Sequence, residues 1–173
     1  RGKEKDGHPF TGFLEAGLMI DAAGHPKTLE FNCRMGDPET QPIMMRLKTD
    51  LLEVMLAATA GQLDTMELEW DRRPALGVVV AAAGYPMNPR KGDAITGLPK
   101  DSDDAMVFHA GTVEKDGVIL SAGGRVLCVT ALADSVKQAQ QRAYDVARGI
   151  HFDGMQYRRD IGYRAIKAMG RNE

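Results

Sequence analysis

Residues 29–41 read Leu29-Glu30-Phe31-Asn32-Cys33-Arg34-Met35-Gly36-Asp37-Pro38-Glu39-Thr40-Gln41. Successive side chains of a β-strand leave opposite faces, so a strand here has one apolar and one polar face. The apolar face is expected to carry Leu29, Phe31 and Cys33. The polar face is expected to carry Glu30, Asn32 and Arg34. A carboxylate, an amide oxygen and a guanidinium thus lie within two strand repeats.

These three polar groups suit phosphate chemistry that depends on a metal ion. Mg²⁺ is commonly bound by one or two carboxylates together with other oxygen atoms, substrate phosphates and water. The sequence therefore predicts Glu30 and Asn32 as metal ligands. The guanidinium of Arg34 suits an anionic substrate group or a phosphoryl group in transfer. The alternative is an amphipathic edge strand whose polar residues only face water.

The flanking residues predict a hairpin followed by a helix. Strands are expected over residues 13–21 and 27–34, and the second strand is expected to break at Gly36. A single helix is predicted from Pro42 to Ala60, because proline suits a first helical position and Gly61 can stop a helix. Its apolar residues recur at helical spacing and predict one buried stripe. Its N-terminal amides would form an anion site at the end of the strand.

The second half of the chain has a different pattern. Residues 61–74 are polar and read as a linker, and we expect a domain boundary near Trp70 and Asp71. Short strands are predicted over residues 76–83, 106–112, 118–121 and 125–133. A helix capped by Asp134 or Ser135 is expected to run to Arg148, with a short helix over residues 163–169. The expected fold is α+β, with a first domain over residues 1–70. Residues 71–173 are expected to form a small antiparallel β-sandwich or half-barrel with one or two helices.

Composition excludes several classes of partner. The chain has 173 residues and a formal net charge of −2, which argues against broad binding to nucleic acid or to an anionic membrane. No apolar run approaches the ~20 residues that span a bilayer. Cys33 and Cys128 each lie on an apolar strand face, where we expect buried thiols. Two distant cysteines form no disulfide framework, which favours a reducing, cytoplasmic compartment.

The central stretch also resembles a known family. Glu30-Phe31-Asn32, followed by the run from Arg34 to Gln41, is similar to the signature of the phosphoribosylamine–glycine ligase (glycinamide ribonucleotide synthetase) family of the ATP-grasp superfamily. The Glu-x-Asn pattern is shared across ATP-grasp enzymes, whereas the Arg-hydrophobic-Gly-Asp-Pro-Glu-x-Gln run is much more specific. Other matching segments are residues 11–13, 16–20, 107–112, 123–131 and 160–166. The likeness covers nearly the whole chain but only the C-terminal part of the family's enzyme.

The resemblance implies a reaction and a set of roles. Family members phosphorylate glycine with ATP and join the glycyl phosphate to 5-phosphoribosylamine, which gives glycinamide ribonucleotide, ADP and phosphate. The resemblance assigns Glu30 and Asn32 to Mg²⁺ or Mn²⁺, with ATP as co-substrate. We expect Arg34 to stabilise the transferring phosphoryl group and Asp37 to orient an amine. Glu39 is expected to brace the turn or the start of the helix.

The resemblance also implies partners that this sequence does not contain. The family's adenine-nucleotide lobe and N-terminal domain are absent, so no nucleotide-binding residue is assigned and the chain alone is expected to be inactive. Many ATP-grasp enzymes carry another metal-binding acid on the preceding strand. That stretch here reads Ala16-Gly17-Leu18-Met19, and Glu15, just upstream, is left outside the metal set. Two alternatives remain open: a non-catalytic binding or interaction module, and another ATP-grasp carboxylate–amine ligase.

The candidate functional residues in the second half of the chain are less specific. His109 lies in an apolar strand and is expected to be structural. Gly123-Gly124-Arg125 resembles a family loop that could approach a nucleotide or a ribose phosphate, and the alternative is a tight turn. Arg158, Arg159 and Asp160 match the family pattern but are expected to form a surface ion cluster.

Overall fold

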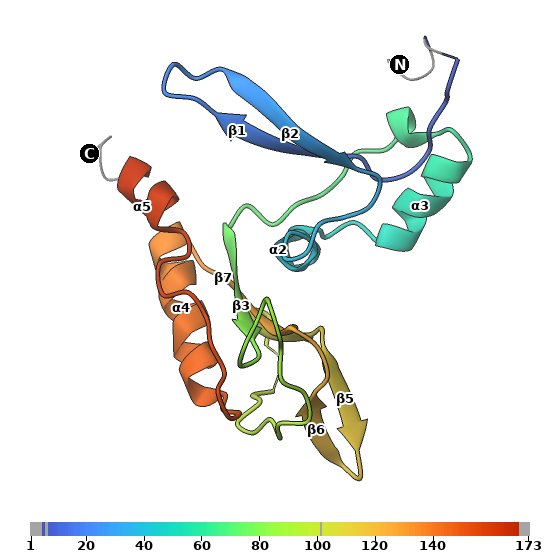
Figure 1. Ribbon diagram of the computed structural model, residues 1–173. Coiled ribbons are helices and arrows are strands. Elements are labelled where there is room, and N and C mark those ends of the chain that lie inside the picture. Colours follow the sequence, from blue (N-terminus) through green and yellow to red (C-terminus); the bar gives the residue numbers. More distant parts are fainter. Residues whose placement is uncertain (1–4, 6, 101, 170–173) are drawn as a thin grey trace. The chain divides into compact units, whose positions relative to one another are not determined.

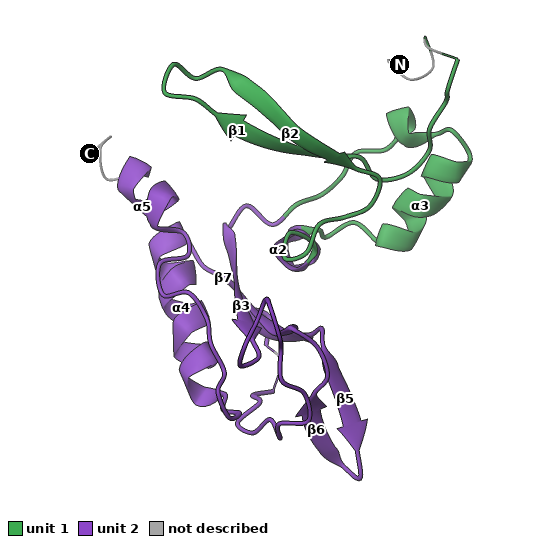
Figure 2. Cartoon of the chain, in the orientation of Figure 1, with its two compact units in different colours: residues 1–40, 47–70 green, residues 41–46, 71–173 purple. Residues whose placement is uncertain are grey.

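The computed structural model describes residue 5, residues 7–100 and residues 102–169 (Figure 1). The chain divides into two compact units, each described separately below (Figure 2). Unit 1 comprises residues 1–40 and 47–70, and unit 2 comprises residues 41–46 and 71–173. All strand pairs in the described sheets are antiparallel, which confirms the expected combination of antiparallel strands and helices.

Unit 1 contains the predicted hairpin. Strands β1 (Glu15–Ile20) and β2 (Pro26–Asn32) pair around a turn in which Asp21 Oδ1 accepts hydrogen bonds from the amides of Ala23 and His25, each at 2.9 Å. The register shifts by one residue between Gly17 and Leu18, so β2 carries one residue more than β1 along the paired stretch. This bulge aligns Glu15 with Asn32 across the hairpin.

The hairpin exposes its apolar side chains. Leu29 and Phe31 are 65% and 64% exposed, because no other described layer of the unit covers that face. The prediction that Cys33 is buried is wrong. Strand β2 ends at Asn32, so Cys33 lies in the following bend, where it is exposed.

The single helix predicted over residues 42–60 is also wrong. The structure has two helices there, α2 (Thr40–Arg46) and α3 (Leu51–Thr59). Between the two helices the backbone pairs with a distant segment instead of continuing the helix. Leu47 bridges Trp70, and the Lys48 amide donates to the Glu69 carbonyl at 2.9 Å. Asp50 then caps α3 by accepting from the Leu52 amide at 2.8 Å. Neither helix, each described in full, contains a buried side chain, so the buried-stripe prediction fails too.

Unit 2 is built on a three-stranded sheet in the order β3-β7-β4. Its strands are β3 (Ala75–Ala81), β7 (Arg125–Leu132) and β4 (Ala105–His109), and β5 (Thr112–Lys115) forms a separate hairpin with β6 (Val118–Ser121). Helices α4 (Val136–Gly149) and α5 (Tyr163–Met169) confirm the two helices predicted in this half.

The 3₁₀ helix η1 (Leu63–Thr65) of unit 1 lies within the segment expected to be a linker. None of the described helices is both long enough and apolar enough to cross a bilayer.

The core of unit 2 lies between α4 and the sheet (Figure 1). Helix α4 contributes the fully buried residues Ala139, Ala143 and Ala147, whose small side chains let the helix approach the strands closely. After α4, Ile150 and Phe152 are each only 1% exposed and complete this core. On the other side of β3, a Cβ atom added at Gly77 would lie 3.3 Å from Pro42 Cγ, so Pro42 of α2 packs on that face.

Gly97 marks a close backbone approach that can be tested. It has a φ of +73°, and a Cβ atom there would lie 1.9 Å from the Gly149 carbonyl oxygen. Gly92 has a similar φ of +89°, but no described atom lies within 4 Å of its added Cβ atom. We expect Gly92→Ala to cost only the left-handed backbone penalty, about 1–2 kcal/mol. Gly97→Ala should lower the free energy of unfolding further, measured by urea denaturation. If both variants lowered the free energy of unfolding equally, the close approach at Gly97 would be contradicted.

Candidate functional site

Glu30 and Asn32 lie together at the end of the hairpin. The Asn32 Nδ2 atom donates to Glu30 Oε1 at 3.3 Å, with Glu30 exposed and Asn32 half-buried. The structure therefore brings the two predicted metal ligands into contact and leaves them accessible. A half turn of the Asn32 amide would exchange its nitrogen and oxygen, so Oδ1 can also face a cation held by Glu30.

The oxygen donors of this pair fit a magnesium ion that is shared with phosphates. Among the described residues, no group of three or more His, Cys, Asp or Glu side chains is arranged to hold a metal ion. Mg²⁺ does not need such a group, because it keeps several waters and is held by one or two carboxylates plus substrate phosphates. An accessible carboxylate with an amide beside it meets that requirement.

Arg34 lies two residues beyond the end of β2, so the strand predicted to reach Arg34 is too long. Its side chain is 65% exposed. Nη1 donates to the Met35 carbonyl at 3.1 Å and lies 3.9 Å from Glu15 Oε2. Arg34 thus forms a long ion pair with Glu15 of β1, a residue outside the predicted site.

The bulge in the hairpin explains why Glu15 was missed. If the pairing that starts at Ile20 and Pro26 continued without the bulge, Glu15 would lie opposite Phe31, on the apolar face. The shift of one residue sets it opposite Asn32 instead, and cross-strand partners share a face. A glutamate at the start of β1 is visible in the sequence, but the bulge that turns it to the polar face is not.

Gly36 makes room for two carboxylates. A Cβ atom at this buried position would lie 2.3 Å from Glu39 Oε2 and 2.8 Å from Glu15 Oε2. The Thr40 amide donates to the Gly36 carbonyl at 3.0 Å and starts α2, whereas Asp37 and Glu39 are exposed in the turn. Because α2 has only seven residues, the anion site expected from a long helix loses its basis.

Unit 2 holds a mainly apolar cavity of about 380 Å³. Its lining residues are Val79, Ala81, Tyr85, Arg125, Gln156, Tyr157 and Arg158. Arg158 pairs with Asp160 through hydrogen bonds of 2.9 and 2.7 Å, and this pairing lowers the pKa of the Asp160 carboxyl group. The surface ion pair expected between these two residues is therefore present.

The glycines of the Gly123-Gly124-Arg125 loop are explained by packing within unit 2. A Cβ atom at Gly124 would lie 2.5 Å from the Tyr85 ring, and one at Gly111 would lie 2.7 Å from Gly123 Cα. These contacts favour the tight-turn interpretation of the loop. His109 lies at the exposed end of β4, where its Nδ1 is 3.0 Å from Thr112 Oγ1.

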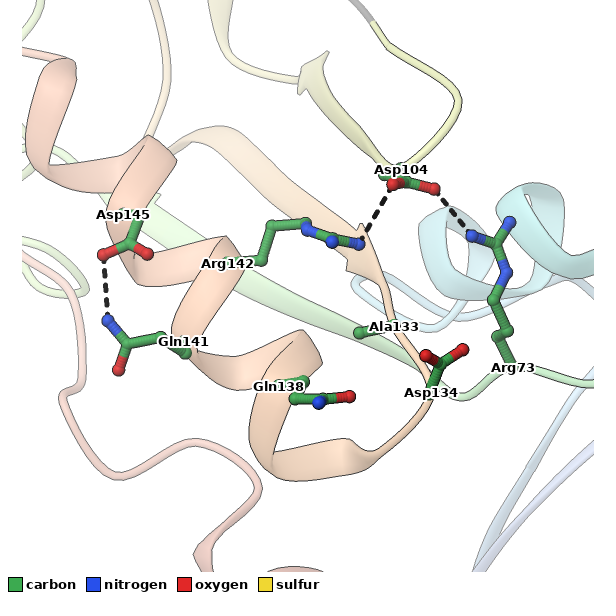
Figure 3. A pocket seen from close by; sticks show the side chains of 8 residues that line it. All are labelled: Arg73, Asp104, Ala133, Asp134, Gln138, Gln141, Arg142 and Asp145. Carbon is green, nitrogen blue, oxygen red and sulfur yellow. Dashed lines mark hydrogen bonds and ion pairs between the residues drawn. The ribbon is translucent and has the colours of Figure 1, made fainter.

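A second cavity, of about 420 Å³, lies beside α4 and is polar (Figure 3). Its centre is Asp104, which accepts from Arg73 Nη1 at 2.6 Å and lies 3.3 Å from Arg142 Nη1. Arg73 also binds Asp71, and these two carboxylates raise the pKa of the Arg73 guanidinium. Both arginines are therefore neutralised within unit 2, which indicates an ion network that supports the fold.

Two segments of the chain match known families. Residues 75–164 match the family described as "Phosphoribosylglycinamide synthetase, C domain". Residues 1–40, which contain the β1–β2 hairpin and the polar turn, match "Phosphoribosylglycinamide synthetase, ATP-grasp (A) domain". The first match alone covers more than half of the chain.

Similar proteins are named as ligases. A "Phosphoribosylamine--glycine ligase" of Ralstonia nicotianae is 67% identical over 96% of this chain and 40% of its own length. One from Vibrio vulnificus is 58% identical over 96% of this chain and 39% of its own length. The chain thus spans about 40% of the length of these curated relatives.

Two solved structures are similar to this chain. The crystal structure of a phosphoribosylamine–glycine ligase from Thermotoga maritima is 41% identical, with a TM-score of 0.80 over 92% of this chain and 39% of that one. A biotin carboxylase domain of Hydrogenobacter thermophilus 2-oxoglutarate carboxylase, crystallised with MgADP, shares the fold at 15% identity and a TM-score of 0.60, over 82% of this chain and 32% of that one. On these matches, the chain belongs to the phosphoribosylglycinamide synthetase family.

Proposed function

We propose that this chain is the C-terminal portion of an ATP-dependent ligase that joins 5-phosphoribosylamine and glycine. The products are glycinamide ribonucleotide, ADP and phosphate, as in de novo purine biosynthesis. The observation that carries the proposal is the contact between Glu30 and Asn32, in a chain so similar to named ligases. Its partners are then ATP, glycine, phosphoribosylamine and the rest of the same enzyme, in the cytoplasm.

Glu30 and Asn32 would hold Mg²⁺ or Mn²⁺ through a carboxylate oxygen and an amide oxygen. When bound, such an ion neutralises phosphate charge on ATP. Their position at the end of β2 supports this role, because backbone pairing with β1 holds both residues in place. Positioning and charge neutralisation supply most of the catalysis in phosphoryl transfer, so no protein nucleophile is required.

Arg34 and Asp37 would act on the reacting groups. In the first step a glycine carboxylate oxygen takes the γ-phosphoryl group of ATP, and ADP leaves. In the second, the amine of phosphoribosylamine attacks the acyl carbon, and phosphate leaves. Nε and Nη2 of Arg34 have no hydrogen-bond partner among the described residues, so this edge can bind two anionic oxygens. Asp37, exposed in the turn, would accept a hydrogen bond from an amine.

A coupled assay of ADP release tests the proposal. We expect the full-length ligase to sustain ADP release over many turnovers only when both glycine and phosphoribosylamine are present. This chain alone should release none, because it spans only about 40% of the length of the ligases that it matches. Steady-state ADP release that is equally fast without phosphoribosylamine would contradict the proposal.

The same assay separates the two alternatives. A non-catalytic module predicts no turnover by the full-length protein with any of these substrates. Another ATP-grasp carboxylate–amine ligase predicts faster ADP release when a different carboxylate replaces glycine, or a different amine replaces phosphoribosylamine. The run from Arg34 to Gln41 favours the glycine-dependent reaction over both.

A further inference from the structure

We propose that Glu15 is a positioning residue for Arg34. Its carboxylate holds the guanidinium from the Nη1 side, so that the Nε and Nη2 edge is presented to the anionic oxygens of the substrate. The inference rests on the proposed function, because Arg34 has its catalytic role only there. Glu15 itself acts through Arg34 and needs no contact with substrate.

The geometry of the hairpin supports this role. Glu15 begins β1 opposite Asn32, so its backbone is held by the same pairing that holds the predicted metal ligand. Its side chain is 30% exposed, compared with 65% for Arg34, and its Oε2 atom is buried. Among the described residues, that oxygen accepts no hydrogen bond, and its one ion pair is with Arg34 Nη1 at 3.9 Å.

The space for this carboxylate depends on Gly36. An added Cβ atom there would lie 2.8 Å from Glu15 Oε2, so a larger residue would displace the carboxylate. The Glu39 carboxylate borders the same space at 2.3 Å from that point. The φ of Gly36 lies outside the left-handed region, so a backbone requirement does not account for this glycine. The glycine is explained instead by the room that it leaves for the carboxylates of Glu15 and Glu39.

Arg34 needs such support because it is exposed and long. Fixing an arginine side chain in one geometry costs about 2 kcal/mol of rotamer entropy. The Met35 carbonyl alone gives Nη1 one neutral acceptor at 3.1 Å. The Glu15 carboxylate adds a charged partner on the same nitrogen, from a strand whose position is held by backbone pairing. The remaining edge of the guanidinium is then preorganised for a bidentate anion.

The test uses four variants of the full-length ligase: Glu15→Gln, Arg34→Ala, their double variant and the control Glu67→Gln. Glu67 is another exposed glutamate of unit 1. Removing an outer-shell partner of a metal ligand typically costs 10- to 100-fold, and by analogy we expect Glu15→Gln to lower kcat about tenfold. The KM for ATP should change by less than about twofold, because the support matters for the transition state. Glu67→Gln should match the wild type.

The double variant decides the mechanism. If Glu15 acts through Arg34, adding Glu15→Gln to Arg34→Ala causes no further loss of kcat. Losses that multiply, or a wild-type kcat in Glu15→Gln, would overturn the positioning role and leave the proposed function intact. Full turnover by Arg34→Ala would instead overturn the assigned role of Arg34, and with it this inference. Melting curves followed by circular dichroism report on folding, and a rate loss in Glu15→Gln that merely tracks a lower Tm would also overturn it.

Discussion

Replacing Glu30 by alanine in the full-length ligase should reduce ADP release by about 100-fold or more. A preorganised electrostatic group aimed at developing charge is worth about 10²–10³ in kcat, and Glu30 supplies the one carboxylate of the predicted metal pair. Asn32→Ala should have a smaller effect, because a neutral amide contributes less attraction to a cation than a carboxylate does. Both are measured by steady-state kinetics over a range of Mg²⁺ concentrations.

The metal-binding role of Glu30 predicts a second, separate result. If Glu30 holds the cation, raising the Mg²⁺ concentration should partly restore the rate of Glu30→Gln, which keeps the size of the side chain but not its charge. Thr28→Ala is a matched control, because Thr28 is an exposed residue of the same strand. Unchanged turnover in Glu30→Ala would remove the metal role from this residue.

The largest effect on stability is expected for Phe152→Ala. Phe152 is 1% exposed and is the largest fully buried side chain of the described core. Truncating a buried phenylalanine leaves a cavity and typically costs about 3–5 kcal/mol. The free energy of unfolding of unit 2 should fall by this amount, as measured by urea denaturation followed by circular dichroism.

The two cysteines provide a local measurement of the same effect. Cys128 is 1% exposed in β7, whereas Cys33 is exposed in unit 1. A thiol reagent should label Cys33 at once and Cys128 only when unit 2 opens. Phe152→Ala should accelerate Cys128 labelling by about 100-fold or more, since 1.4 kcal/mol corresponds to a factor of ten. Leu56→Ala, at a side chain 60% exposed in unit 1, should not. Unchanged protection of Cys128 in Phe152→Ala would contradict the packing of this core.

Local patterns in the sequence predicted most elements of unit 2 correctly. Short apolar runs located β3, β4 and β7. A cap at Asp134 or Ser135 with an apolar stripe located α4, and in the structure Ser135 is the cap, accepting from the Gln138 amide at 3.2 Å. These predictions succeeded because the apolar residues of these elements pack into one core, in which the near-continuous apolar run of β7 is buried on both faces.

The structure of unit 1 differs from the prediction of its local sequence patterns, for physical reasons. Residues 42–60 have helical periodicity throughout, yet backbone pairing of Leu47 with Trp70 interrupts the helix, because a distant segment offers the same amides another partner. The contact between Glu30 and Asn32 followed from strand alternation alone. The approach of Glu15 to Arg34 did not, since it depends on a bulge between Gly17 and Leu18.

By itself the sequence determined the family, the polar face that carries Glu30 and Asn32, and the order of most strands and helices. Those features depend on residue identity and on spacing over a few positions. Only the tertiary structure decided which carboxylate accompanies Arg34, where the helix after the polar turn ends, and that Gly36 makes room for Glu15 and Glu39. Each of these depends on register or on contacts between segments far apart in the chain. A shift of one residue, which leaves no mark in local composition, moves a side chain to the opposite face of a strand.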